Sequence, residues 1–255
     1  RIRVNDTDGG SSGWNTYSDV ITVNNNLPSL QNYALSADEV LRTSTIIIGA
    51  NTTDTEDTES SHAVSVEYRA PSGDWSSSAL STPWYSSSTS RWETNFTPPS
   101  SFELGEYDLR IKVTDTDGGS TGWNTYSDVI SVLNNLPSVQ NYSVSSSVVI
   151  RTETIVLRAN VTDIEDQEPE HALTLQYNSP SGSWSSANLS TFWYNSSAGH
   201  WETNFTPHSG METGNYSIRI MSNDTDGGSS GWNVYSDAFR VTNSVIQITS
   251  YAVSD

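Results

Sequence analysis

Acidic side chains are the groups in this sequence whose spacing best suits a defined chemistry. They gather in short stretches with Thr, Asn or Gly, such as the TDTDGG segment at 114–119. Converging carboxylates repel one another unless a cation neutralises them, and Ca²⁺ takes about six to eight oxygen ligands from such a mixture. We therefore predict Ca²⁺ as a cofactor. The candidate ligands are Asp6, Asp8, Asp54, Glu56, Asp57, Asp115, Asp117, Asp163, Glu165, Asp166, Asp224 and Asp226.

These acidic stretches also have a plainer interpretation. Asp and Gly are ordinary turn residues, and acidic loops are common on protein surfaces. The Asp-x-Asp-Gly pattern at 115–118 lacks the third acidic position of an EF-hand loop. The sequence leaves both interpretations open.

Asparagines in the pattern Asn-x-Ser/Thr are candidate glycosylation sites. A chain this rich in Ser and Thr would contain about half as many by chance, so their placement matters more than their number. Asn51, Asn95, Asn160 and Asn204 fall on the outward face of predicted strands, and we predict that at least one sequon carries a glycan. The sequons are Asn5, Asn51, Asn95, Asn141, Asn160, Asn188, Asn195, Asn204, Asn215 and Asn223.

Three tryptophans on Gly-rich loops, Trp14, Trp123 and Trp232, are candidates for stacking on sugar rings. A large aromatic residue that recurs in this way also caps the end of a sandwich or packs against a neighbour. No Ser/His/Asp set, phosphate-binding loop or glycosidase carboxylate pair stands out. We predict that the chain is not an enzyme.

The charge balance limits the partners. Thirty acidic residues against eleven basic ones give a formal net charge of −19, and Lys112 is the single lysine. This balance argues against nucleic acid or an anionic membrane as a partner. The sequence has no cysteine for a disulfide or thiolate site and no apolar run long enough to span a membrane.

The acidic stretches and the tryptophans recur because the sequence repeats itself every 109 residues, as Trp14, Trp123 and Trp232 show. A unit of this length can bury its own core. We predict the C-terminal part of a module at 1–26, full modules at 27–135 and 136–244, and the first strand of a further module at 245–255. The sequence thus looks like a window cut from a longer array.

Alternation of apolar and polar residues places the elements that must carry these groups. It predicts strands near 30–36, 45–52, 64–68, 92–97 and 105–113, and a last strand in which Ile130 and Val132 point inward. The copies 109 residues later agree. About seven short strands per module without a helical period predict an all-β fold of antiparallel β-sandwiches.

Three segments carry a resemblance to a known class of repeats. They are Gly105-x-Tyr107-x-Leu109-x-Ile111 with the following Val113–Gly119, the linker Asn134–Pro137, and the acidic turn Asn160–Asp166. Together they resemble the immunoglobulin-like, PKD-type and cadherin-like repeats of bacterial and archaeal surface proteins. The resemblance implies tandem immunoglobulin-like modules, in which Tyr107 and Tyr216 occupy the position of a tyrosine corner. The cysteine pair and central-strand Trp of antibody domains are absent.

The immunoglobulin strand order would place two acidic loops at the same end of each module, beside the preceding linker. Asp54, Glu56 and Asp57 would meet Asp115 and Asp117. In the next module, Asp163, Glu165 and Asp166 would meet Asp224 and Asp226. Cadherin-like repeats stiffen tandem arrays with Ca²⁺ at such junctions, which is what the resemblance implies here.

Taken together, these observations predict a non-enzymatic protein of the cell surface or extracellular space that forms a stalk, fibre or surface layer. Its partners would be neighbouring modules, other copies in a fibre, and attached glycans. One alternative is an adhesin or carbohydrate-binding array that uses the Trp-bearing loops. A third is a set of accessory modules of a large secreted enzyme.

Overall fold

The protein is built almost entirely from β-strands. The computed structural model describes residues 1–244, and within them the only helices are two single 3₁₀ turns, Glu59–Ser61 and Glu168–Glu170. Neither these nor any other described segment forms a helix that could cross a membrane. The all-β prediction is confirmed, while the strand predicted at 245–255 lies outside the described residues.

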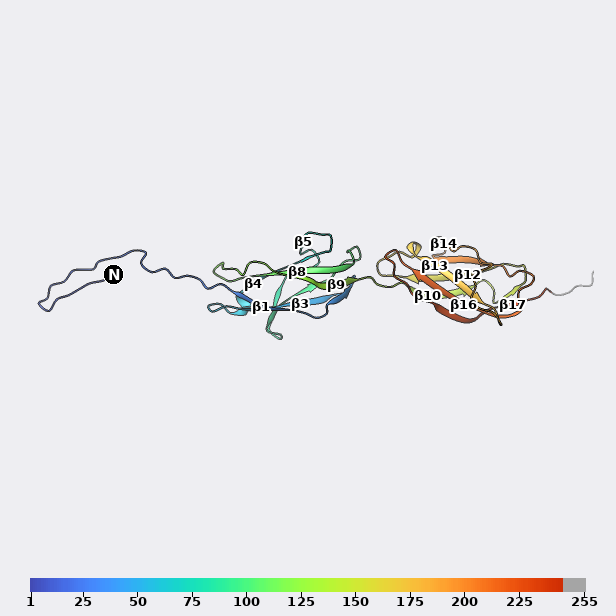
Figure 1. Ribbon diagram of the computed structural model, residues 1–255, viewed down its shortest axis with the longest axis horizontal. Coiled ribbons are helices and arrows are strands. Elements are labelled where there is room, and N and C mark those ends of the chain that lie inside the picture. The colour runs from blue at the N-terminus through green and yellow to red at the C-terminus, as the bar shows by residue number, and fades with distance from the viewer. Residues whose placement is uncertain (245–255) are drawn as a thin grey trace, which may run out of the picture. The chain divides into compact units, whose positions relative to one another are not determined.

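The first sandwich contains nine strands in two sheets (Figure 1). One sheet has the order β1-β3-β7-β6 and the other the order β2-β9-β8-β4-β5. The strands are β1 Ser29–Leu35, β2 Glu39–Leu41, β3 Ile46–Thr53, β4 Ala63–Arg69, β5 Trp75–Ser76, β6 Trp84–Ser86, β7 Arg91–Phe96, β8 Gly105–Thr114 and β9 Asn124–Leu133.

The second sandwich repeats this arrangement with eight strands. Its sheets have the orders β10-β12-β15-β14 and β11-β17-β16-β13. A single bridge between Tyr177 and Ser185 stands where β5 lies in the first sandwich. The strands are β10 Ser138–Val144, β11 Val148–Ile150, β12 Ile155–Thr162, β13 Ala172–Asn178, β14 Trp193–Asn195, β15 His200–Phe205, β16 Gly214–Asn223 and β17 Asn233–Thr242.

These orders are those of an immunoglobulin fold, with strands A-B-E-D in one sheet and G-F-C in the other. Two features differ from the prediction. The strand count exceeds seven because short edge strands are added, β2 and β5 in the first sandwich and β11 in the second. In addition, β2 pairs with β9 and β11 with β17 in parallel, because the chain crosses from one sheet to the other after β1 and after β10 and continues beside the last strand.

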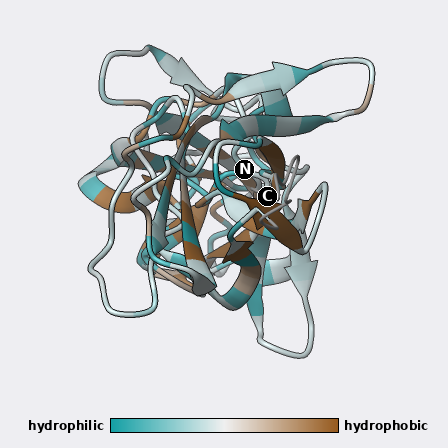
Figure 2. Ribbon diagram, turned by 90° about the vertical axis from the view of Figure 1, so that its right-hand side faces the viewer, coloured by the Kyte–Doolittle hydropathy of each residue, from teal (hydrophilic) through white to brown (hydrophobic). Residues whose placement is uncertain are grey.

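Each core is formed by every second residue of the long strands, as the pleat requires. In β8, Tyr107, Leu109, Ile111 and Val113 are completely buried. Figure 2 shows hydrophobic residues along the strands and hydrophilic residues in most of the loops. The core therefore follows the alternation that the sequence displays.

A tyrosine corner fixes the start of the long strand in both sandwiches. The hydroxyl of Tyr107 donates to the Glu103 carbonyl oxygen at 2.8 Å, and that of Tyr216 donates to the Glu212 carbonyl oxygen at 2.8 Å. Both rings are buried. The prediction from their position is confirmed.

Contacts within the chain define two compact units, whose limits differ from the predicted modules. The second unit takes in Asp38–Thr45, Thr97–Tyr107 and the chain from Ile130 onward. The loop that carries Arg42 therefore belongs to the same compact unit as the second sandwich. The predicted module boundaries stay a prediction. Within 1–26, pairing consists of isolated bridges, Ile2 with Asn15 and Asn5 with Ser11.

Candidate functional site: two acidic loops and an arginine

The loop between β16 and β17 is organised by the carboxylate of Asp224. Its Oδ1 atom accepts hydrogen bonds from the backbone N–H groups of Gly228 at 2.7 Å and Asp226 at 3.0 Å. Its Oδ2 atom accepts from Nδ2 of Asn134, in the linker before β10, at 2.8 Å. One carboxylate thus closes its own turn and holds the linker.

Each of the two adjacent glycines of this loop is needed for a different physical reason. Gly227 has a φ of +90°, a left-handed conformation that residues with side chains rarely adopt. Gly228 has no such φ, but a Cβ atom there would lie 2.6 Å from Nδ2 of Asn134 and would also collide with the Asp224 carboxylate. The first glycine makes the turn, and the second lets the linker approach.

The second acidic loop follows β12 and meets the first. Asp163 Oδ1 accepts from the backbone N–H of Glu165 at 2.8 Å, which shapes the turn. Asp166 accepts from the hydroxyl of Thr225 at 2.9 Å, so that the two loops are joined. Glu165 accepts from the backbone N–H of Asn135 at 3.1 Å and from its side chain at 3.0 Å.

We call Asp163, Glu165, Asp166, Asp224 and Asp226 the second acidic cluster. The first acidic cluster is Asp54, Glu56, Asp57, Asp115 and Asp117, and it has the same construction. Each cluster lies beside two linker asparagines. In the first cluster these contacts are Asn25 with Asp115 at 2.8 Å, Asn26 with Glu56 at 3.1 Å, and Thr116 with Asp57 at 2.8 Å.

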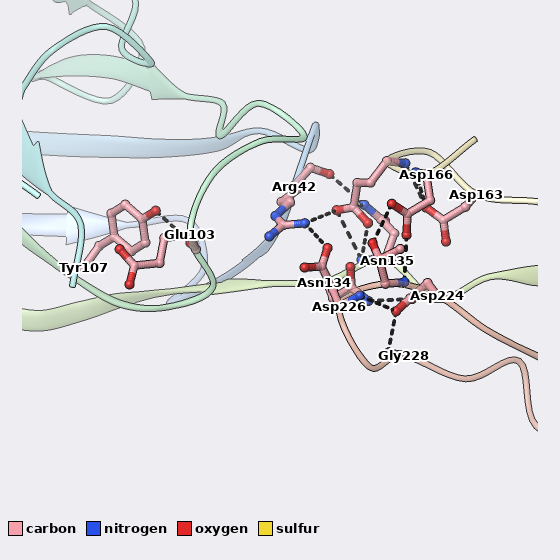
Figure 3. Close-up of polar contacts among 12 residues, drawn as sticks. Arg42, Glu103, Tyr107, Asn134, Asn135, Asp163, Asp166, Asp224, Asp226 and Gly228 are labelled. Atoms are coloured by element: carbon pink, nitrogen blue, oxygen red, sulfur yellow. Dashed lines mark hydrogen bonds and ion pairs between the residues drawn. The ribbon is translucent and has the colours of Figure 1, made fainter. Parts of the chain in front are cut away.

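The cation at the second acidic cluster is a side chain that sequence reasoning missed, Arg42 (Figure 3). Its Nη1 atom lies 2.5 Å from Asp226 Oδ2 and 4.0 Å from Glu165 Oε1. The Arg42 carbonyl oxygen accepts from Asn135 Nδ2 at 3.0 Å. The side chains of Arg42 and Glu165 are only 7% and 2% exposed. All four residues belong to the second compact unit.

Burial has the largest effect on the pKa of Glu165. It raises the pKa of the Glu165 carboxyl, against the hydrogen bonds from Asn135 and the positive charge of Arg42, both of which lower it. A carboxylate that is out of water in this way is stable only if it is paired. The guanidinium and the asparagine amide supply that pairing.

The turn that presents Arg42 is strained. Thr43 has a φ of +63°, an outlying conformation for a β-branched residue. Its backbone N–H is held by the Pro98 carbonyl oxygen at 2.6 Å. The copy, Thr152, has a φ of +72°. The signal that could have revealed this site is the pair Arg42-Thr43 and Arg151-Thr152, a recurring basic position in an acidic chain.

The clusters fit the predicted calcium site only in part. Across residues 1–244, no three His, Cys, Asp or Glu side chains are arranged to hold a metal ion. However, Asp54 Oδ2, Asp163 Oδ2 and Asn134 Oδ1 are buried oxygen atoms without a hydrogen-bond partner, and hard cations prefer such atoms. The Asp6 carboxylate accepts hydrogen bonds from the backbone N–H groups of Asp8 and Gly10 and so stabilises the turn in which it lies. Calcium stays a prediction.

The predicted stacking tryptophans have cationic neighbours. The Arg110 guanidinium lies 4.3 Å from the centre of the Trp123 ring and 4.5 Å from that of Trp75. Arg219 lies in the same way against Trp232 and Trp184, at 4.2 and 4.7 Å. Arg3 is 5.1 Å from the ring of Trp14. These contacts anchor the loops by cation–π attraction, although Trp123 and Trp232 each remain 37% exposed.

The predicted glycan acceptors differ in how free their amides are. Asn160 Nδ2 donates to the Gly199 carbonyl oxygen at 2.8 Å and to Glu168 at 3.3 Å. Asn188 Nδ2 lies 3.3 Å from the Tyr177 hydroxyl. Asn51, the counterpart of Asn160, makes no such side-chain hydrogen bond within the described residues. Asn5, Asn141 and Asn215 are exposed.

Comparisons with known proteins leave the family open. No protein-family description matches the sequence, and no curated protein matches it. Solved structures of similar fold include titin domains Z1Z2 in complex with telethonin (14% identity, TM-score 0.41, 87% of this chain and 98% of that one). A second is the fibronectin(III)-like modules of CbhA from Clostridium thermocellum (12% identity, TM-score 0.27, 89% of this chain and 100% of that one). A third is the adhesin InvE of Yersinia pseudotuberculosis (12% identity, TM-score 0.35, 82% of this chain and 58% of that one). These similarities are too low to carry an argument, so the description of the fold rests on the strand order.

Proposed function

We propose that this chain is a non-enzymatic structural part of an extracellular fibre, stalk or surface layer, built from immunoglobulin-like modules joined end to end. The observation that carries the proposal is the contact of the buried Arg42 side chain with Glu165, Asp226 and Asn135. It ties the loop after β2 to the linker and to both acidic loops. We call this contact the arginine latch.

Geometry supports a stiffening role for the latch. The Arg42 turn is held at three points, through its guanidinium, its own carbonyl oxygen and the backbone N–H of Thr43. A turn held at several points in a strained conformation has little freedom to rotate. We expect a junction restrained in this way to bend less than a free linker.

Repetition supports the same proposal. Both acidic clusters, both tyrosine corners and both Arg-Thr turns recur at the same spacing. An enzyme needs one active site, whereas a spacer gains length from every added copy. The recurring parts here are those that fix loops and linkers.

The test compares two arginines of the same chain. We expect Arg42→Met to let the two sandwiches tumble more independently, as measured by ¹⁵N relaxation and residual dipolar couplings. Arg151→Met is the matched control, because it removes the same side chain from the equivalent turn of the second sandwich. If Arg42→Met leaves the relaxation unchanged, the latch does not stiffen the junction.

Calcium is a further part of this proposal. Asp163 and Asn134 would hold the ion through their unpartnered buried oxygens, and Asp54 would do so in the first cluster. A bound ion would supply positive charge to the linker in addition to Arg42. We expect calorimetry to show a rise in melting temperature with Ca²⁺ that Asp163→Asn reduces. An unchanged melting temperature in Ca²⁺ and in chelator would remove calcium from the proposal.

A second candidate function is carbohydrate binding, and a groove beside Trp123 favours it. The groove has a volume of about 460 Å³ and is lined by Glu67, Ser77, Thr82, Lys112 and Trp123 among others. Hydroxyl groups, an ammonium and an indole are suitable groups for a sugar. Binding to a glycan array that Trp123→Ala abolishes would support this function. If the intact chain binds no glycan on the array, carbohydrate binding is not its function.

A further inference from the structure

A pair of tyrosines bridges the two sheets of each sandwich. Tyr33 of β1 and Tyr126 of β9 have ring centres 4.2 Å apart, and their ring planes are tilted by 44°. Tyr142 of β10 and Tyr235 of β17 repeat this contact at 4.1 Å and 40°. Each pair lies within one compact unit, and all four residues are half-buried. The contact therefore joins the first and the last strand of a sandwich in both copies.

Irregularities in the strands accompany both pairs. The register of β10 against β12 shifts just before Tyr142, as that of β1 against β3 does before Tyr33. On β17, Asp237 has a φ of +51° and lies where the pairing with β16 also shifts. Its counterpart on β9, Asp128, has a φ of +54°. Bulges re-aim the side chains beside them, so both copies present the two rings to each other in the same way.

Two phenol rings held this close can be joined by one-electron oxidation, because proximity makes the coupling step intramolecular. Each phenol gives one electron to the oxidant and its hydroxyl proton to water, which leaves a phenoxyl radical. The two radicals form a carbon–carbon bond between the ring positions next to the oxygens, and the hydrogens at those positions move to the oxygens to restore the phenols. The chain loses two hydrogen atoms per cross-link, while one hydrogen peroxide is reduced to two waters.

We propose that the Tyr33–Tyr126 and Tyr142–Tyr235 pairs are sites of oxidative cross-linking, at which a peroxide-driven one-electron oxidant forms dityrosine and clamps each sandwich shut. The sequence contains no cysteine, so no disulfide can supply such a clamp. The edge strands β1 and β10 each pair with a single neighbour, and the link would fix them to the opposite sheet. It would enclose nearly the whole sandwich, and a cross-link that closes a longer loop restricts the unfolded chain more.

The test oxidises the chain in dilute solution with light, tris(bipyridyl)ruthenium(II) and persulfate, which together act as a small one-electron oxidant. We expect dityrosine fluorescence and the loss of two hydrogen atoms from the intact mass for each link. Peptide mass spectrometry should locate the links at Tyr33–Tyr126 and Tyr142–Tyr235, within single chains on a denaturing gel. The oxidised chain should also melt at a higher temperature, and links that leave the melting temperature unchanged would overturn the clamp.

The two copies control each other. Tyr142→Phe should remove the second link and leave the first, because phenylalanine keeps the ring but cannot form a phenoxyl radical, and Tyr33→Phe should do the reverse. The Tyr177–Tyr216 pair should stay unlinked, since its ring centres are 5.8 Å apart and both rings are buried in the core. Dityrosine found only between chains, or undiminished when both substitutions are combined, would overturn the inference. The arginine latch takes no part in this test, so the proposed function is tested separately.

Discussion

Arg42 shows how a charged residue can be buried in an acidic protein. Removing one partner of a buried ion pair commonly costs about 3–5 kcal/mol, whereas replacing the whole set by neutral groups is often close to neutral. The latch has this character at Glu165, which is even less exposed than Arg42, whereas Asp226 is 32% exposed. Its contribution should therefore depend on which charges remain.

We expect Arg42→Met to destabilise the second compact unit by about 3 kcal/mol, because it leaves Glu165 buried without a cation. Adding Glu165→Gln should recover much of this loss, since the amide oxygen still accepts from Asn135. Urea denaturation followed by circular dichroism measures both changes. Equal stability of Arg42→Met and the double variant would show that the Glu165 charge is not the cause.

Glycan attachment should discriminate between copies of one sequon. The amide nitrogen of Asn160 is already hydrogen-bonded to Gly199 and Glu168, and a glycan on that atom would have to break these contacts. We expect glycopeptide mass spectrometry of native material to find Asn51 occupied and Asn160 bare. Occupancy of Asn160 at or above that of Asn51 would contradict this reasoning.

The sequence predicted the acidic residues of this site but missed the arginine that pairs with them, for a physical reason. Asp224, Asp226 and Glu165 are visible because short acidic motifs recur. The partner of Asp226 is Arg42, which lies far away in the sequence and in a different repeat. Likewise, the Asn160 amide is engaged by the backbone of Gly199. Contacts of this range depend on tertiary packing and leave no local pattern.

Among the elements, the loop between β16 and β17 depends on its second glycine. We expect Gly228→Ala to destabilise the second sandwich by about 1–3 kcal/mol, because the added methyl group collides with Asp224 and Asn134. Gly210→Ala is the matched control, since its nearest neighbour is the movable His208 ring at 3.3 Å. Thermal denaturation compares the two variants. A loss for Gly228→Ala no larger than that of the control would contradict the steric argument.

The strands were predicted unequally well. Long strands such as β8 and β12 alternate clearly because one face is buried over their whole length. The three-residue strand β2 has one buried residue, Val40, between two exposed ones. A pattern of three residues carries no period, and its parallel pairing with β9 depends on where the chain crosses between sheets. Such edge strands require the tertiary structure.

For the whole molecule, stability should fall in acid. Hydrogen bonds from Arg69 and from the Asp128 backbone lower the pKa of Asp108, and a hydrogen bond from His200, with others, lowers the pKa of Glu202. A carboxyl whose folded pKa is depressed stabilises the fold above its unfolded pKa, and this contribution disappears as the pH falls through the folded pKa.

Glu165 acts in the opposite direction. Its pKa is raised by burial, so its protonation favours the folded state as the pH falls through that raised value. We expect thermal melts to show a net loss of stability between about pH 4 and pH 2, and Asp108→Asn to flatten the profile in that range. An unchanged slope for Asp108→Asn would show that Arg69 does not hold this carboxyl.

The parallel pairing of β2 with β9 has a mechanical consequence. β2 lies near the start of the first sandwich and β9 at its end, and the two are joined by hydrogen bonds from Arg42 to Leu133 at 3.0 Å and from Ser131 to Asp38 at 2.7 Å. Because the strands run in the same direction, a pull on the two ends of the sandwich drags them past each other. The hydrogen bonds then carry the load together in shear and do not open one at a time. A chain of such sandwiches would resist tension at every repeat.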